Sequence, residues 1–182
     1  MKKTADLKKF YQYAFPMKAA LLTTIDKNSK TNIITVAWHT PISKNPPLFG
    51  VSVAPSRFSH DLIKNSKEFV INFAPYDIVK NIHFCGTHSG RNTDKQKETN
   101  LSFVDSKIVK PKSILECFSH LECKLNNIIT IGDHSLVVGE VVNLTYSEGI
   151  FKDDVIDISK TKPCFYLGNK VYSDISKNKI SF

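Results

Sequence analysis

The stretch PPLFGVSVAPSRFSHDLIKNS, residues 46–66, decides the fold. Within it, residues 48–54 form a compact apolar run with prolines on both sides, which is typical of a buried strand with abrupt ends. Beyond Pro55 the pattern changes, and residues 60–66 predict a short helix with Ser56 or Ser59 as its N-cap. The stretch therefore predicts a strand that leads through a Ser/Arg turn into the start of a helix.

This turn has the features of an anion-binding site. The first N–H groups of a helix have no partner within the helix, and the helix dipole adds partial positive charge there. Arg57 adds a planar, permanently charged group that suits phosphate. Spacing alone favours the alternative, an ordinary capped helix with a solvated Arg57.

The use of arginine favours the anion site. Lys and Arg together number 25, yet only Arg57 and Arg91 are arginines, and both lie in short turns that contain serine. Lysine therefore carries the general surface charge of this chain. Arginine at these two places indicates sites that need its bidentate geometry.

The composition predicts one folded domain over residues 1–182, with a C-terminal tail from about residue 148 that matches no motif. No apolar run is long enough to span a bilayer, and the N-terminus lacks the apolar core of a signal peptide, so we expect no membrane partner. The four cysteines form no Cys-x-x-Cys pair and read as reduced thiols of a cytoplasmic protein.

The formal net charge of +8 raises the alternative of a nucleic-acid-binding protein. The lysines are spread along the whole chain, and there is neither a block of like charge nor an RNA-binding signature. We therefore expect no nucleic-acid partner, although the charge would help to attract a phosphorylated cofactor or substrate.

Strand patterns dominate the rest of the chain, and they do not alternate regularly with helices. This favours a mainly β fold, an antiparallel β-barrel with a few peripheral helices, over a parallel doubly wound sheet. Residues 39–45 and 87–101 are expected to be loops. The strand candidates are 17–25, 32–38, 48–54, 68–73, 114–125 and 135–146, with two brief pieces within 164–175, and the helix candidates are 5–15, 60–66 and 77–86.

Few short motifs in the sequence indicate a catalytic, cofactor-binding or metal-binding site. Neither GxGxxG nor GxxxxGK[ST] occurs, so a cofactor phosphate would have to be held by Ser, Thr and Arg side chains and backbone N–H groups. His83-x-Cys85-x2-His88 lacks the second pair that a structural zinc site needs, and we predict no metal. His134 follows a Gly-Asp turn and could exchange a proton with a ligand, but an exposed histidine in a hairpin turn fits equally well.

A series of motifs in fixed order makes residues 17–146 resemble the flavin reductase-like family, the FMN-binding split-barrel group that includes flavoredoxin. The motifs are NIITVAW at 32–38, PPLFGVSV at 46–53, RFS at 57–59, EFVIN at 68–72, CG-x2-SGR-x2-DK at 85–95, LEC at 121–123, GDH at 132–134 and GEV at 139–141. The resemblance implies a split β-barrel, a homodimer, and FMN bound non-covalently near the subunit interface.

The resemblance also implies roles for individual residues. Along the flavin ring and ribityl chain would lie Asn32, Thr35, Val36, Ala37 and Trp38. Backbone groups for the polar edge of the ring would come from Ser52, Val53 and Ala54, and the phosphate would be held by Arg57 and Ser59. The ribityl-phosphate end would be closed by Ser89, Gly90, Arg91 and Lys95, and the catalytic His134 would stand near the ring or the nicotinamide. His39 departs from the aromatic or aliphatic residue that many relatives have after the Trp.

These implications predict an FMN-dependent oxidoreductase of the flavin reductase/flavoredoxin type, which transfers hydride or electrons from NAD(P)H through FMN. The alternative is an FMN-binding electron carrier without its own nicotinamide site, reduced by a protein electron donor. Steady oxidation of NAD(P)H would separate the two. No motif for the ribose 2′ position distinguishes NADH from NADPH.

Overall fold

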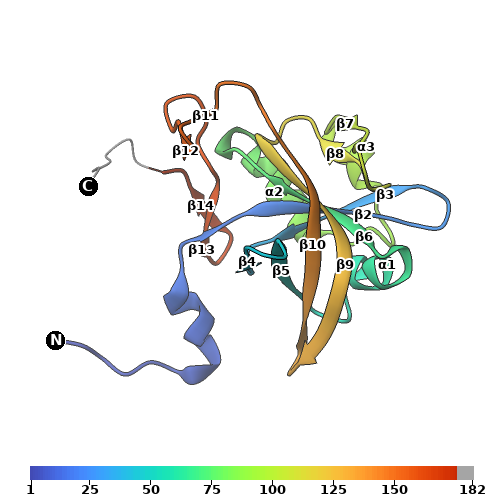
Figure 1. Ribbon diagram of the computed structural model, residues 1–182. Coiled ribbons are helices and arrows are strands. Elements are labelled where there is room, and N and C mark those ends of the chain that lie inside the picture. Colours follow the sequence, from blue (N-terminus) through green and yellow to red (C-terminus); the bar gives the residue numbers. More distant parts are fainter. Residues whose placement is uncertain (176–182) are drawn as a thin grey trace.

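The computed structural model describes residues 1–175 (Figure 1). Its helices are η1 (Leu7–Ala14), α1 (Phe58–Ser66), η2 (Tyr76–Ile78), α2 (Val79–Thr87) and α3 (Lys95–Thr99). Its strands are β1 (Met17–Lys18), β2 (Ala20–Ile25), β3 (Thr31–Val36), β4 (His39–Ser43), β5 (Leu48–Val53), β6 (Glu68–Phe73), β7 (Phe103–Val104), β8 (Ser113–Ile114), β9 (Ser119–Ile131), β10 (His134–Tyr146), β11 (Phe151–Lys152), β12 (Val155–Ile156), β13 (Phe165–Gly168) and β14 (Val171–Ser173).

The main sheet has seven antiparallel strands in the order β3-β2-β6-β9-β10-β5-β4. Its two edge strands, β3 and β4, follow each other in the chain, so the covalent link through Ala37 and Trp38 joins the two edges and curls the sheet into a barrel. The amide of Ser52 donates to the Trp38 carbonyl at 2.8 Å and holds this corner to β5. The predicted fold class, a mainly β split barrel with a few helices, is confirmed.

The barrel interior is filled by apolar side chains from strands that the sequence predicts. Phe69, Val51 and Ile71 are fully buried in one cluster, and each contributes roughly 1.5–3 kcal/mol through burial. Gly139 lies where the β9–β10 register shifts, and a Cβ there would meet the ring of Phe69 and Cys123 Cβ. The glycine therefore lets β10 pass close over the core.

A buried carboxylate fixes the segment between β7 and β8. Glu122, on β9, is 1% exposed and accepts hydrogen bonds from the amides of Lys107, Ile108 and Val109. Asn143 Nδ2 donates to the same carboxylate at 2.7 Å. Burial alone would raise the pKa of Glu122. The four hydrogen-bond donors together have the larger, opposite effect, so the pKa lies below its ordinary value. The LEC motif therefore has a structural role, because its glutamate holds the segment between β7 and β8 in place.

Two expected loops contain regular structure. Residues 39–45 were expected to form a loop, which is wrong, because His39–Ser43 forms edge strand β4, paired with β5. Pro41 obscures the strand pattern, yet an edge strand tolerates proline because one of its sides makes no ladder hydrogen bonds. The expected loop 87–101 contains α3, whose first turn is capped by Asp94.

The predicted N-cap of α1 is also wrong. Arg57, not Ser56 or Ser59, is the N-cap residue, and its side chain makes no capping hydrogen bond. Ser59 lies inside the helix and is buried. The helix begins two residues earlier than expected, at Phe58, and the buried Ser59 accepts a hydrogen bond from Asn32 Nδ2.

The long hairpin β9–β10 extends beyond the barrel as an arm (Figure 1). Its two strands have 13 residues each and are joined by Gly132 and Asp133, with Gly132 in the left-handed region at φ 63°. The strands are longer than the barrel needs. His134, the first residue of β10, is therefore carried on this arm.

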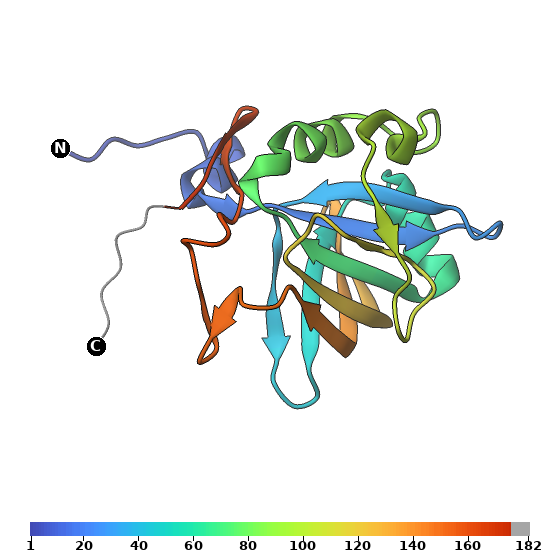
Figure 2. The same cartoon turned by 90° about the horizontal axis from the view of Figure 1, so that it is seen from above.

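The C-terminal tail folds back onto the start of the chain. β13 pairs with β1, with Tyr166 opposite Met17, and β14 completes this second, three-stranded sheet. Figure 2 shows α2 and α3 along one side of the barrel, with the β13–β14 hairpin next to the start of this layer. In the part of the chain described, no helix is long and apolar enough to cross a membrane.

Candidate functional site

A cleft of about 320 Å³ opens where β3, β5, α2 and the β13–β14 hairpin meet. Many of the residues that sequence analysis assigns to the site line it. These are Thr35, Val36, Ala37, Trp38, Ser52, Val53, Ala54, Arg57 and His134. Residues from both edges of the sheet meet here because Ala37 and Trp38 close the barrel.

A second, narrower cleft of about 200 Å³ continues from the first. The two share Ile34, Arg57 and Gly86. The narrow cleft is lined by the remaining predicted residues, which are Asn32, Ser59, Ser89, Gly90, Arg91 and Lys95. The structure thus brings every predicted site residue to one elongated cleft, wide at the Trp38 end and narrow and cationic at the Lys95 end. Their individual roles stay predictions.

Arg57 stands at the junction of the two clefts. It occupies the N-cap of α1, where the helical N–H groups begin, and its side chain is exposed. Within residues 1–175 its guanidinium forms no ion pair or hydrogen bond. A free guanidinium at the N-terminus of a nine-residue helix is suited to an anion.

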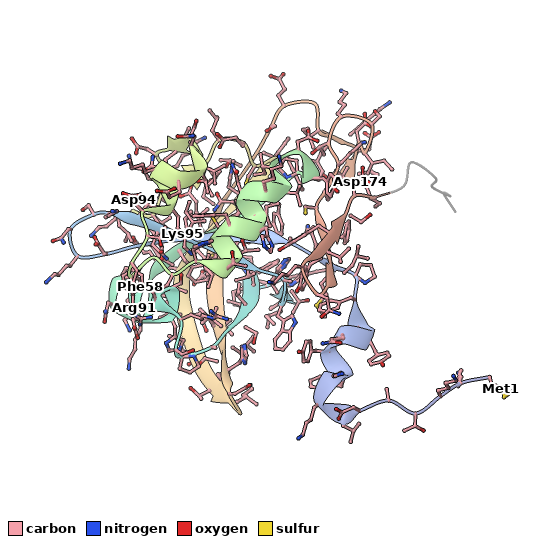
Figure 3. The ribbon with its side chains drawn as sticks, turned by 180° about the vertical axis from the view of Figure 1, so that it is seen from behind. Met1, Phe58, Arg91, Asp94, Lys95 and Asp174 are labelled. Atoms are coloured by element: carbon pink, nitrogen blue, oxygen red, sulfur yellow. The ribbon has the colours of Figure 1, made fainter. Side chains whose placement is uncertain are left out.

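Lys95 provides a buried ammonium group at the narrow end (Figure 3). The residue is only 5% exposed, and its Nζ donates to the carbonyls of Ile33 and Cys85 at 2.7 Å each. An ammonium has three donors, so one N–H is left for a ligand. Burial lowers the pKa of Lys95 to about 8, since desolvation disfavours the charged form.

Arg91 is already engaged. Its guanidinium donates to the Asp61 carboxylate at 2.7 Å and to the Ser56 carbonyl at 3.0 Å, and it lies over the Phe58 ring at 5.2 Å. Figure 3 shows Phe58 and Arg91 side by side. These contacts attach the loop before α3 to α1. Arg91 therefore lines the narrow cleft while its charge is largely compensated.

Asn32, Ser59 and Gly90 form a tightly packed floor for the narrow cleft. Asn32 Nδ2 donates to Ser59 Oγ at 2.8 Å and to Thr24 Oγ1 at 3.2 Å. A Cβ at position 90 would collide with the Asn32 side-chain amide. Only glycine lets the loop backbone approach β3 this closely.

The wide end has an aromatic wall. The rings of Trp38 and His134 lie 5.1 Å apart at 40°. His134 Nδ1 is 2.8 Å from Asp133 Oδ1, and this hydrogen bond lowers the pKa of Asp133. The carboxylate fixes Nδ1 as a donor, which leaves Nε2 for a ligand.

Two of the predicted polar groups already have partners within the protein. Thr35 Oγ1 donates to the Ile82 carbonyl, and the Ser52 amide donates to the Trp38 carbonyl.

Among the residues that line the wide end and were not predicted as site residues are His83, Tyr166, Lys170 and Tyr172. His83 Nδ1 lies 3.4 Å from the Tyr172 hydroxyl, and burial raises the pKa of Tyr172 to about 12. The tail that carries the tyrosines has no motif. No local signal could link it to α2, almost 90 residues earlier.

His39 lies outside this cleft. It lines an adjoining groove of about 580 Å³, which shares Ala37, Trp38 and Ser52 with the wide end, and it stacks on Phe49 at 5.8 Å. Its Nε2 is 2.8 Å from the Lys18 carbonyl, and burial lowers its pKa. The unusual residue after the Trp therefore packs against the barrel core.

Comparison with known proteins gives consistent matches. A family model described as a flavin reductase like domain matches residues 12–172. An uncharacterized protein from Archaeoglobus fulgidus is 36% identical over 148 residues, which cover 81% of this chain and 82% of that protein.

Two solved structures are similar to this one over nearly the whole length of both chains. An FMN-binding protein from Thermus thermophilus, solved with 1-cyclohex-2-enone bound, is similar with a TM-score of 0.83 and 27% identity, covering 100% of this chain and 98% of that one. The flavoredoxin of Desulfovibrio vulgaris (Miyazaki F) is similar with a TM-score of 0.87 and 25% identity, covering 100% and 97% of the two chains.

Proposed function

This chain belongs to the flavin reductase-like family, and we propose that it is an FMN-binding oxidoreductase that takes electrons from a reduced nicotinamide. The predicted resemblance to this family is confirmed. One observation carries the proposal, the convergence of all predicted site residues on a single cleft with a cationic narrow end and an aromatic wide end.

The shape and charge of the cleft fit FMN. At the narrow end, unpaired Arg57, buried Lys95 and the N-terminus of α1 suit a phosphate dianion. At the wide end, Trp38 and the β3–β5 corner offer an apolar wall for a planar ring system. The two ends adjoin through Ile34, Arg57 and Gly86, so one ligand that combines both groups can occupy both clefts.

When bound, FMN supplies the hydride and electron transfer. The residues of this chain bind and orient it. Arg57 and Lys95 would hold the phosphate, Asn32 and Gly90 would fix the narrow wall, and His134 Nε2 would hold or donate a proton at the wide end. The support for FMN itself comes from the FMN-binding protein of Thermus thermophilus and from the flavoredoxin, which share the fold and 25–27% of the sequence.

The experiment that tests the proposal starts from the visible absorption spectrum of the freshly purified protein. A yellow protein that releases FMN in near-equal proportion to chain, and then oxidises NADH or NADPH with turnover, supports it. A protein that stays colourless after incubation with excess FMN and gel filtration overturns it.

An FMN-binding electron carrier is the second candidate, supported by the similarity to flavoredoxin. The two functions differ in where the electrons come from. Turnover with a reduced nicotinamide favours the oxidoreductase. A yellow protein that is reduced rapidly only by a protein donor favours the carrier.

We also propose that the protein is a homodimer. Support comes from large apolar side chains exposed on the hairpin arm and on η1, among them Ile131 at 65% and Phe10 at 68%. Light scattering after gel filtration tests this, and a monomeric mass at micromolar concentration contradicts it. The four free, buried cysteines support the proposal of a reducing, cytoplasmic compartment.

A further inference from the structure

The cleft does not end at Tyr172. A groove of about 420 Å³ runs on between α2 and the β13–β14 hairpin. It shares His83, Thr87, Lys170 and Tyr172 with the wide end of the cleft. A ligand that reaches the wide end can therefore extend a second part of itself along α2, away from the narrow end.

This groove is cationic. Its positive charge comes from Lys80 and Lys170, and no acidic residue within residues 1–175 lines it. Neither Lys80 nor Lys170 forms an ion pair with a described residue. The carboxylate at the end of the hairpin, Asp174 (Figure 3), is paired with Lys162 at 3.2 Å. The positive charge of the groove is therefore uncompensated.

Lys170 occupies an unfavourable backbone position. It and Asn169 form the two-residue turn between β13 and β14, and both have positive φ, 65° and 47°. Such turns favour Asn and Gly, because a larger side chain is strained in the left-handed region. The turn itself therefore does not explain the lysine at its second position.

Aromatic rings accompany the charge. Phe84 and His88 stack in parallel with centroids 3.9 Å apart, and the His88 ring is fixed by its Nδ1 at 3.1 Å from the Phe84 carbonyl. Tyr172 lines the opposite wall. A flat surface beside uncompensated lysines suits a phosphorylated ligand that also has a planar ring.

We propose that this groove binds the adenosine-phosphate half of the nicotinamide donor, with Lys80 and Lys170 on the 2′-phosphate of NADPH. The assignment rests on the proposed function, since only a donor whose nicotinamide reaches the wide end would extend into this groove. A carboxylate that could hold the ribose 2′-hydroxyl of NADH is absent from the described lining, whereas two free lysines suit an additional phosphate. The oxidoreductase thus has a donor site of its own.

Calorimetric titration of the FMN-loaded protein with NADP⁺, NAD⁺ and 2′,5′-ADP tests the assignment without turnover. NADP⁺ is expected to bind about tenfold more tightly than NAD⁺, as one additional charge-assisted contact gives. The adenosine probe 2′,5′-ADP should compete with NADP⁺.

The variants are chosen so that a loss of folding cannot be mistaken for a loss of NADP⁺ binding. Lys80→Ala and Lys170→Asn should each weaken NADP⁺ binding roughly fivefold, the effect of a solvent-exposed ion pair. Lys170→Asn should leave the unfolding temperature unchanged or raise it, because Asn suits the turn. Lys27→Ala and Lys44→Ala, two exposed turn lysines on other loops, serve as the matched controls and should bind NADP⁺ as the wild type does.

Three results would overturn the assignment. They are unchanged NADP⁺ affinity in the Lys80→Ala/Lys170→Asn double variant, equal affinity for NADP⁺ and NAD⁺, and a yellow protein that binds none of the three nucleotides. In each case the flavin remains bound, so the proposed FMN site survives. A protein that cannot be loaded with FMN overturns the function on which the assignment rests.

Discussion

The guanidinium of Arg91 lies 2.7 Å from the carboxylate of Asp61, and this ion pair attaches the loop before α3 to the first turn of α1. Arg57, only one turn of chain away from Asp61, has no such partner among the described residues. The two arginines of the chain are thus unequal. Arg91 attaches the loop before α3 to α1, whereas Arg57 is free to bind a ligand.

Replacing these arginines should therefore have different effects. Arg57→Ala should weaken FMN binding by about 1.5–3 kcal/mol, the loss of a charge-assisted contact. Arg91→Ala should weaken it less and should lower the free energy of unfolding by only about 0–1 kcal/mol, because the Arg91–Asp61 pair is exposed. Fluorescence titration with FMN and chemical denaturation measure both. Equal losses of FMN affinity in the two variants would contradict this inequality.

FMN affinity should fall as the pH rises through about 8. The pKa of Lys95 is lowered from 10.5 to about 8, so its positive charge is present below that pH and is lost above it. A phosphate dianion binds the protonated form more tightly, and by linkage it raises the pKa in the complex. The dissociation constant is measured between pH 6.5 and 9.5. In Lys95→Met, which must first be shown to fold by circular dichroism, this pH dependence should disappear.

Gly90→Ala should destabilise the narrow cleft, because the new methyl group collides with the Asn32 side chain. Overpacking of this kind costs about 1–3 kcal/mol. A double variant that also carries Asn32→Ser removes the obstacle and should recover part of the loss. Thermal unfolding and FMN titration of the single and double variants measure the coupling. Additive losses would mean that the two residues do not interfere.

His134→Gln should slow reduction of the bound flavin while leaving its affinity nearly unchanged. His134 stands beside Trp38 at the wide end and does not line the narrow cleft, where the phosphate is proposed to bind. The loss of a positioned proton donor costs about 10²-fold or more in rate. Stopped-flow reduction by NAD(P)H, compared with the FMN content of the variant, measures this. If reduction proceeds at the wild-type rate, His134 is only a wall of the cleft.

Glu122 should make the fold sensitive to acid. Its pKa is lowered in the folded state, so its contribution is present above the unfolded-state pKa and is lost as the pH falls through the lower folded-state value. Glu122→Gln should lower the free energy of unfolding at pH 7 by about 1–3 kcal/mol, because the amide cannot satisfy three backbone N–H groups as the carboxylate does. Denaturation at pH 4 and pH 7 should show a smaller pH effect in the variant. Glu116→Gln is the matched control, because within residues 1–175 Glu116 accepts a hydrogen bond only from the amide of Ser102.

Much of the fold was predictable from local patterns. Residues 68–73 and 48–53 are strands as predicted, and the second of these is buried as its apolar run predicts. The order of the motifs predicted the family and the split barrel. The residue-level roles could be proposed because short motifs determine which side chains follow which turn.

What the sequence by itself determined is most of the local elements and the residues that they present, among them Arg57 in the turn that leads into α1. Only the tertiary structure decided that Asp61 engages Arg91, that Pro41 lies in an edge strand, and that Lys170 and Tyr172 reach the cleft. The physical reason is the sequence separation between the residues that interact. Helices and turns follow from neighbours within a few residues, whereas pairing between β1 and β13 depends on contacts almost 150 residues apart, for which the local sequence carries no signal.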